Sequence, residues 1–243
     1  MSSAIPGHDH AVPGSDPRSA PVARVSRAAL TANARAAWER GIRWYDPSIL
    51  EADAWGHGAE LARRVLAREG FTSGASVRAR RRQDSEPWAM PARAQHLSPS
   101  WFFGLTGVQH PTAPALRLTG TVLSVKDLRA GEGVSYGYAY RAPADTRVAL
   151  VTGGYAQGIV RGLGGAVHVV IAGERHAIVG RVAMDVCVVE IADAAIPRGA
   201  EVLFLGDPAL GEPSLADWVH ATGLTAGELI TAVGLRATRV EAP

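Results

Sequence analysis

The chain has 243 residues, a net charge of +2 and a single cysteine. Hydrophobic residues make up 47% of it and charged residues 20%, which is typical of a globular protein and excludes a chain too polar to fold. One cysteine excludes an intrachain disulfide, and no apolar run approaches the ~18 residues that a membrane span requires. The N-terminus lacks a basic segment followed by an apolar one, so we expect a cytoplasmic protein.

The first twenty residues are rich in Ser, Pro, Gly and Ala and show no hydrophobic periodicity. This composition predicts a disordered tail over residues 1–20. His8 and His10 offer two imidazoles, but no further ligand accompanies them, so we expect no metal site.

The next segment predicts a helix, a strand and a second helix. Ser26 is a suitable N-cap for a helix that ends at Gly41, and a second helix is expected over 59–69. Between them, 49–54 is predicted as a short strand. This order is typical of the start of a β/α fold.

The pattern breaks between residues 71 and 99, where we predict neither strand nor helix. Four arginines gather here, at positions 78, 80, 81 and 82. Such a cluster is compatible with a solvated loop or with binding to phosphate or nucleic acid. Aromatic residues are not interleaved with it, which favours the solvated loop and no nucleic-acid partner.

From residue 116 onward the sequence predicts an all-β domain of roughly 110 residues, because short apolar runs alternate with glycine-containing turns. Cys187 lies in one of these runs and is expected to be a small buried hydrophobic residue. A short helix near 214–222 and a last segment over 228–240 follow. The expected strands cover residues 119–125, 134–140, 148–151, 166–171, 178–191 and 201–205.

Four segments of this β-domain resemble, in order, the motifs of the alanine racemase family. They are G-E-G-V-S-Y-G at 131–137, G-Y-A-Q-G at 154–158 followed by Arg161, G-R-V-A-M-D at 180–185, and the closing stretch 228–239. The resemblance implies a pyridoxal-phosphate enzyme of fold type III. In that family a (β/α)8 barrel precedes the β-domain.

The front of the chain resembles the two ends of that barrel. Residues 51–58, E-A-D-A-W-G-H-G, are similar to the family's cofactor-lysine motif K-A-D-A-Y-G-H-G, and Phe103-Gly104 is similar to the pair that closes the barrel. About 45 residues separate the two points, whereas a complete barrel needs ~250. We therefore expect an α+β protein with a tail over 1–20, an incomplete barrel over 21–114 and a β-domain over 115–243.

The resemblance also implies the site residues. Tyr136 matches the tyrosine base that one subunit contributes to the other subunit's site, and Met184 matches the residue whose backbone N–H holds the substrate carboxylate. Arg161 and Asp185 belong to the matched motifs, and ordinary charges at strand ends remain an alternative for both. Pyridoxal phosphate is the implied cofactor, and the family motif places Glu51 and Trp55 beside it.

Several positions depart from the family pattern. Glu51 stands where the cofactor lysine should be, and a carboxylate cannot form an imine with an aldehyde. Leu97 replaces the arginine that pairs with the pyridine nitrogen, and Gly227 replaces a phosphate-contacting tyrosine. Gln157 replaces an aspartate. The only lysine of the chain is Lys126, just before the tyrosine segment.

These departures leave several hypotheses open. The first is a catalytically degenerate relative of alanine racemase, connected with D-alanine metabolism. The second is a subunit that donates Tyr136 and Met184 to a full-length racemase. The third is a working racemase that interconverts L- and D-alanine by another route, with Glu51 as a base or an imine on Lys126. In each case we expect a homodimer or a heterodimer with a full-length racemase.

Overall fold

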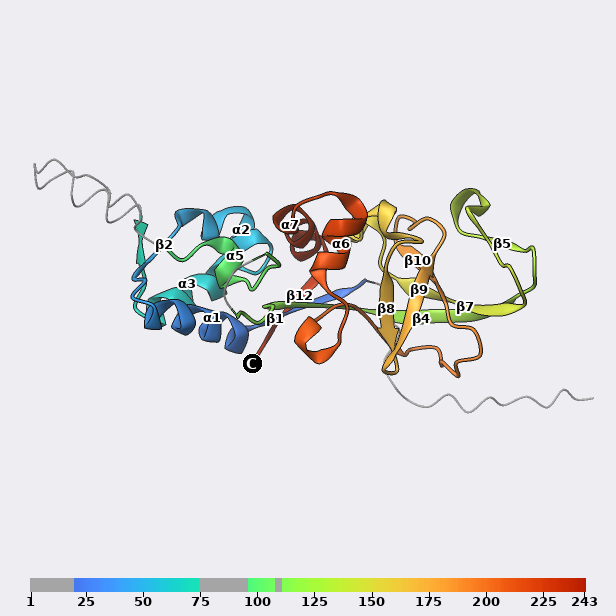
Figure 1. Cartoon of the computed structure of the whole chain (residues 1–243), viewed down its shortest axis with the longest axis horizontal. Helices are drawn as coiled ribbons and strands as arrows, with labels where there is room; N and C mark the ends of the chain where they lie inside the picture. Colours follow the sequence, from blue (N-terminus) through green and yellow to red (C-terminus); the bar gives the residue numbers. More distant parts are fainter. Residues whose placement is uncertain (1–19, 75–95, 108–110) are drawn as a thin grey trace, which may run out of the picture.

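The structure is a computed structural model that describes residues 20–74, 96–107 and 111–243. The expected tail with His8 and His10, and the arginines of 78–82, lie outside these residues. Figure 1 shows short helices at one end of the long axis and β-strands at the other, with helices α6 and α7 between them. The two regions belong to one chain but have different architectures.

Six strands within residues 111–243 close into an antiparallel barrel, as the all-β prediction requires. The long strand β4 closes it, because its start pairs with β11 and its later part with β7. Closure leaves none of the six with an unpaired edge, which is how barrels avoid edge-to-edge association. In ring order the strands are β4 (Leu116–Leu128), β7 (Thr146–Thr152), β10 (Val186–Glu190), β9 (Glu174–Val179), β8 (His168–Ile171) and β11 (Glu201–Leu205).

Two of the expected strands are wrong in their extent. Over 134–140, only β5 (Gly133–Val134) and β6 (Tyr140–Arg141) pair, and a 3₁₀ turn, η2 (Tyr136–Tyr138), separates them. Ser135, Gly137 and Tyr138 have positive φ angles of 68°, 70° and 47°, which a strand does not allow. Similarly, the run 178–191 divides into β9 and β10 at a turn that contains Gly180.

A strand that the sequence analysis missed precedes the first helix. Strand β1 (Val22–Ser26) pairs antiparallel with β4 and parallel with β12 (Thr238–Ala242). Val22, Ala23 and Val25 are buried. Residues from both ends of the described chain therefore complete one sheet with β4.

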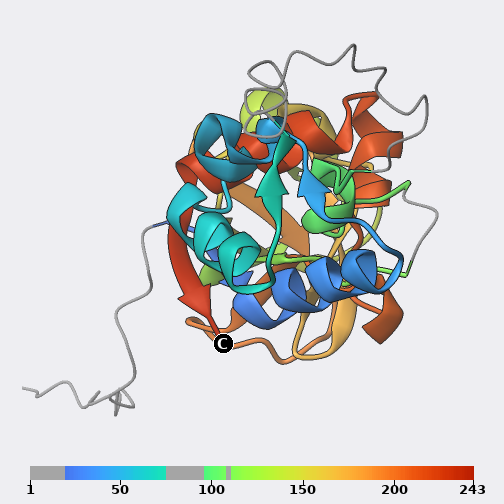
Figure 2. The ribbon, with the colours of Figure 1, turned by 90° about the vertical axis from the view of Figure 1, so that its left-hand side faces the viewer.

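The helical region consists of elements from either side of residues 75–95. Helix α1 (Arg27–Glu39) begins at Ser26, whose hydroxyl accepts the Ala29 N–H at 3.1 Å, and α3 (Ala59–Arg68) confirms the second predicted helix. Strands β2 (Trp44–Tyr45) and β3 (Thr72–Ser73) pair in parallel, and Leu97 forms a parallel bridge with Tyr45. Figure 2 shows the two strands side by side above α1 and α3. This arrangement is an incomplete β/α barrel.

The predicted strand at 49–54 is wrong. The 3₁₀ turn η1 (Pro47–Leu50) leads into α2 (Glu51–Trp55), where Ala52, Asp53, Ala54 and Trp55 have φ between 47° and 55°. This is a left-handed helical turn, which costs non-glycine residues ~1–2 kcal/mol each. The surrounding contacts must therefore hold it in place. The small apolar residues that suggested a strand give no sign of this conformation.

Residues 71–99 contain more structure than expected, since β3 and the start of α5 (Pro99–Phe102) fall there. The buried side chain of Asn33 on α1 joins this part to the β-domain. Its Nδ2 donates to the carbonyls of Phe102 at 3.1 Å and Ala113 at 2.9 Å, and its Oδ1 accepts the Ala113 N–H at 3.0 Å. A fully bonded buried amide fixes α1 against the segment that leads into β4.

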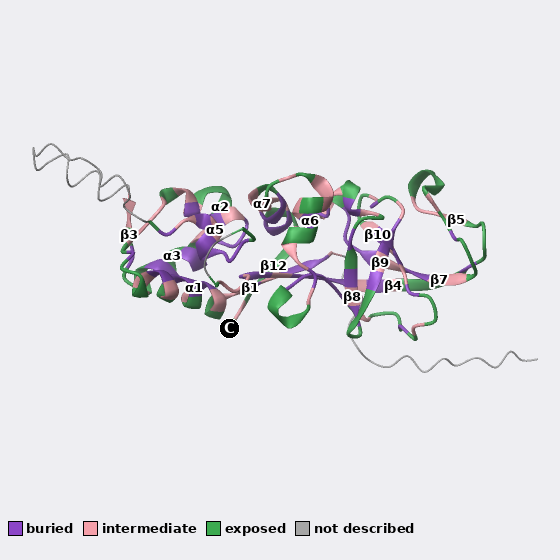
Figure 3. Cartoon of the chain, in the orientation of Figure 1, coloured by how far each residue is buried: buried purple, intermediate pink, exposed green. Residues whose placement is uncertain are grey.

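One apolar core runs through both regions, from Ala23 and Leu30 to Trp218 and Val233. Figure 3 shows the buried residues continuing from the inner faces of α1 and α3 into the barrel. Helices α6 (Leu215–Thr222) and α7 (Ala226–Arg236) cover the junction, and α6 confirms the helix expected near 214–222. In the described part of the chain, no helix is long and apolar enough to cross a membrane.

Two glycines bring the left-handed turn against α7. A Cβ on Gly56 would lie 2.6 Å from the Cα of Gly234, and a Cβ on Gly234 would lie 2.4 Å from the Gly56 carbonyl oxygen. Gly56 also has a φ of 77°. The two backbones therefore touch, and neither position has room for a side chain.

We expect Gly234→Ala to destabilise the protein by about 1–3 kcal/mol, because the new methyl group overlaps backbone that cannot move away. An alanine inside a helix would otherwise be favourable by up to ~1 kcal/mol. Urea unfolding followed by circular dichroism measures the change. Gly162→Ala is the control, since nothing lies within 4 Å of its added Cβ. Equal stability of the two variants would contradict the contact.

Candidate functional site

Tyr136 lies on the η2 turn at the end of the molecule formed by β5 and β6. The hydroxyl oxygen of Ser135 accepts the Arg181 N–H at 3.0 Å, which ties the turn to the segment after β9. A Cβ on Gly180 would lie 2.1 Å from this oxygen, so the glycine is required there. The Tyr136 side chain itself is 70% exposed.

The Arg161 side chain contacts two tyrosine rings at this end of the antiparallel β-barrel. It begins the 3₁₀ turn η4 (Arg161–Leu163), and its guanidinium carbon lies 5.3 Å from the ring centroid of Tyr136 and 5.9 Å from that of Tyr155. A cation at such a distance is attracted by the ring quadrupole. The arginine therefore orients the exposed tyrosine rings.

Met184 and Asp185 are bound to the turn that carries Tyr155. The Met184 carbonyl accepts the Ala156 N–H at 2.9 Å, and Gln157 accepts the Gly154 N–H at 2.9 Å while donating to Asp185 Oδ1 at 3.0 Å. A Cβ on Gly154 would lie 2.2 Å from the Met184 carbonyl oxygen. The structure thus brings together four sequence-predicted residues of the β-domain: Tyr136, Arg161, Met184 and Asp185.

The remaining predicted residues belong to the left-handed turn. Glu51 begins α2 and is exposed. Asp53 Oδ1 accepts the Ala59 N–H at 2.8 Å, and Asp53 Oδ2 forms an ion pair with Arg239 at 2.6 Å. The hydrogen bond from Ala59 and the Arg239 charge hold the pKa of Asp53 below its ordinary value. Arg239 also donates to the Gly56 carbonyl at 3.1 Å, so the turn is fixed from β12.

Trp55 fills space between α2 and α7. Its Nε1 donates to the Ser48 carbonyl at 2.9 Å, and its ring centroid lies 6.1 Å from that of Phe103. A Cβ on Gly227 would lie 2.6 Å from Cζ3 of the indole ring. The indole therefore covers the place where a side chain at position 227 would start.

His57 is buried behind this turn and stacks on Phe103, with ring centroids 4.1 Å apart. Its Nδ1 faces the carbonyl oxygens of Ala54 at 3.0 Å and Trp55 at 3.1 Å, so Nδ1 carries the proton. Burial lowers the pKa of His57 to about 4, and the Arg239 charge acts in the same direction. Nε2 is consequently an acceptor, and it has no hydrogen-bond partner among the described residues.

The two groups of predicted residues do not meet. Figure 1 places α2, with Glu51 and Trp55, near one end of the long axis and β5, next to the Tyr136 turn, at the other. Lys126 is exposed on β4, opposite Val148 of β7. A single copy of the chain therefore holds the predicted residues in two separate groups.

His57 and the Asp53–Arg239 pair, which contact the left-handed turn, were not predicted from the sequence. Both belong to the motifs at 51–58 and 228–239, but only the fold shows that β12 reaches the turn. No group of three or more possible metal ligands occurs among the described residues. Cys187 is buried, which raises the pKa of its thiol to about 12, so it is the inert hydrophobic residue that was expected.

These features define an α+β protein in which an incomplete β/α barrel joins a closed antiparallel β-domain. The family model described as "Alanine racemase, C-terminal domain" matches residues 115–241. The alanine racemase of Mycobacterium ulcerans is 42% identical over 129 residues, which cover 52% of this chain and 33% of that protein. The chain belongs to the alanine racemase family and spans about a third of the length of the curated relatives it matches.

Solved structures share the fold over most of the chain. The alanine racemase from Streptomyces coelicolor A3(2) has a TM-score of 0.73 at 20% identity, with 92% of this chain and 98% of that chain covered. The alanine racemase from Bartonella henselae with covalently bound pyridoxal phosphate has a TM-score of 0.75 at 14% identity, with 92% and 99% covered. The likeness therefore extends beyond the β-domain into the helical region.

The buried neutral His57 predicts a specific pH dependence of stability. Since its folded pKa of about 4 lies below the ordinary 6.5, the unfolded chain binds more protons between these values. Stability is therefore complete above pH 6.5 and falls by about 3 kcal/mol as the pH drops to 4. Urea unfolding between pH 4 and 7.5 measures this.

The matched control is His57→Asn, whose amide can still donate to the Ala54 and Trp55 carbonyls but does not titrate. It should be less stable at pH 7 and lose the decline between pH 6.5 and 4. Stability that falls equally in both proteins over this window would show that other groups cause the effect.

Proposed function

We propose that this chain is an alanine-racemase-like protein, connected with D-alanine metabolism, that does not itself form an imine with pyridoxal phosphate. The observation that carries the proposal is the packing of Trp55 against Gly227, together with the exposed Glu51 at the start of the same α2 turn. By the resemblance, these three positions are where the family holds its cofactor. Here they offer a negative charge and an indole ring.

The donor set does not fit pyridoxal phosphate. Imine formation needs an uncharged amine, which Glu51 cannot supply, and its carboxylate would repel the cofactor phosphate. Leu97, at the position of the family's pyridine-pairing arginine, is fully buried and bridges to Tyr45. The indole of Trp55 leaves no room at Gly227 for a tyrosine. Lys126 is exposed on β4 and pairs with Val148 of β7. Figure 1 shows β7 toward the end of the molecule opposite α2.

A second function is favoured by the exposure of the β-domain cluster. Tyr136 is 70% exposed and Met184 is 55% exposed, although both are large apolar side chains. The β5–β6 segment that carries Tyr136 also lies at the opposite end of the long axis from the chain's own α2 turn (Figure 1). Both features suit a subunit that donates Tyr136 and Met184 to the cofactor site of a full-length racemase. We accordingly propose a heterodimer with such a racemase, or a homodimer, as the assembled form.

The proposed assembly uses the division of the chain that the sequence suggested. Residues 115–243, completed by β1, form the part that meets a partner. The described residues of the predicted segment 21–114 that follow β1 form the reduced barrel, whose α2 turn packs on α7. In a mixed dimer this arrangement would support one working site, built from the partner's lysine and this chain's tyrosine.

Incubation with pyridoxal phosphate, followed by borohydride reduction and peptide mass spectrometry, tests the first proposal. We expect no adduct except at the N-terminal amine, and no racemisation of L- or D-alanine. Lys126→Arg is the matched control, because it removes the remaining side-chain amine and keeps the charge. A stoichiometric adduct on Lys126, with racemisation that this variant loses, would overturn the proposal.

Complementation tests the second function. The partner is a full-length alanine racemase in which the tyrosine that matches Tyr136 has been changed to phenylalanine. Mixed dimers with this chain should regain racemisation, because Tyr136 supplies the missing base. Tyr136→Phe should bind the partner equally well and restore no activity. Failure of the two proteins to co-elute in size-exclusion chromatography would contradict the proposed heterodimer.

A further inference from the structure

A cavity of about 290 Å³ lies where the helical region meets the β-domain. Its walls come from segments far apart in the sequence: the chain after α5, the start of β4, the end of β11, and helices α6 and α7. Most of its side chains are apolar, and several are at most 4% exposed. These buried side chains are Phe103, Leu105, Leu116, Leu205 and Ile230, and the partly buried Leu215 also lines the cavity.

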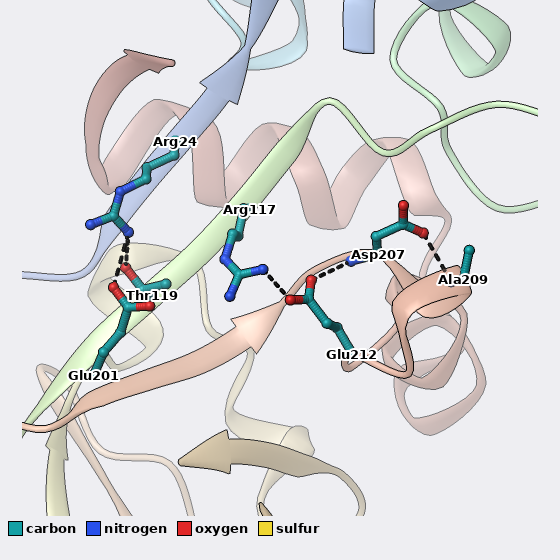
Figure 4. Close-up of polar contacts among 7 residues, drawn as sticks. All are labelled: Arg24, Arg117, Thr119, Glu201, Asp207, Ala209 and Glu212. Carbon is teal, nitrogen blue, oxygen red and sulfur yellow. Dashed lines mark hydrogen bonds and ion pairs between the residues drawn. The ribbon is translucent and has the colours of Figure 1, made fainter. Parts of the chain in front are cut away.

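A hydrogen-bonded network fixes one wall of this cavity. The Asp207 N–H donates to Glu212 Oε2 at 2.8 Å, and Asp207 Oδ1 accepts the Ala209 N–H at 2.9 Å. Glu212 also forms an ion pair with Arg117 on β4, as Figure 4 shows. The 3₁₀ turn η5 (Pro208–Leu210) is thus held in place from both sides, so the cavity is preformed.

His57 lines the same cavity and contributes a buried acceptor. Its Nδ1 proton is already shared between two carbonyls, while its Nε2 lone pair has no partner among the described residues. An unsatisfied buried acceptor costs ~1–3 kcal/mol. His57 also lines a smaller cavity of about 180 Å³ together with charged residues such as Arg64 and Arg239, which suits water.

The lining determines what the large cavity can hold. Asp207 is the one charged side chain among its described lining residues, so a phosphate or carboxylate ligand would be repelled. An apolar cavity of ~150 Å³ already accommodates benzene. We propose that this cavity binds a small neutral ligand with an apolar body and a single hydroxyl or N–H donor, such as a phenol, and that the donor is directed to His57 Nε2.

The proposal does not depend on the loss of cofactor chemistry, because the cavity excludes the charged cofactor and substrate in either case. Titration of the full chain with 4-fluorophenol and with fluorobenzene, followed by fluorine NMR, tests it. Both probes should bind, and the phenol should bind roughly fivefold more tightly, as expected for one additional hydrogen bond. Absence of binding at millimolar concentration, or equal affinity for both probes, would overturn the proposal.

Two variants test the assigned residues. His57→Asn keeps the donor to the Ala54 and Trp55 carbonyls but has no Nε2, so it should bind the two probes equally. Ala216→Trp places a large ring at the exposed rim of the cavity and should abolish binding of both probes, whether or not the first variant folds. Undiminished binding by Ala216→Trp would show that the probes bind elsewhere.

Discussion

The close contact between the left-handed α2 turn and helix α7 determines how the rest of the molecule is arranged. Gly56 and Gly234 touch through their backbones, and Arg239 binds Asp53 and the Gly56 carbonyl. Four consecutive residues with positive φ are unfavourable in isolation. They persist because α7 and β12, which belong to the β-domain, supply the contacts that offset this cost. The left-handed turn of the reduced barrel is therefore held by contacts from the β-domain.

This contact also explains why Trp55 and Gly227 form a pair. Once α2 is held against α7, the side chain at position 55 must lie over the N-terminal part of that helix. An indole fits only because residue 227 has no side chain. The two departures from the family pattern are thus sterically coupled, although they are far apart in the sequence. Either one alone would leave a clash or a void.

Much of the fold could be predicted from the sequence, and the reasons for the failures are physical. Helices α1 and α3 were predicted from their apolar periodicity and, for α1, from the Ser26 N-cap. Most strands of the antiparallel barrel were predicted from short apolar runs that alternate with glycine-containing turns. Strand β1 was missed because its five residues carry no pattern of their own and pair only with β4 and β12. The left-handed turn at 52–55 was missed because Ala and Asp give no local sign of positive φ.

The candidate site was only partly predictable for the same reason. The motifs identified Tyr136, Met184 and Glu51, because each of these positions is recognised from its own short sequence segment. The unpaired Nε2 of His57, the Arg239 ion pair and the apolar cavity depend on segments that meet only in three dimensions. Spacing along the chain cannot reveal such contacts, whereas the burial of His57 and its stacking on Phe103 do.

The position of β1 has a consequence for how this chain relates to longer members of its family. Strands β1 and β4 are direct neighbours in one sheet, and the whole helical region lies between them in the sequence. In topological terms, the incomplete β/α barrel is an insertion into the β-domain. The two ends of this insertion lie side by side, at β1 and β4. An insertion of this kind can lose its middle during evolution without changing any strand pairing of its host. The β-domain therefore tolerates a reduced barrel for the same reason that other domains tolerate a shortened loop.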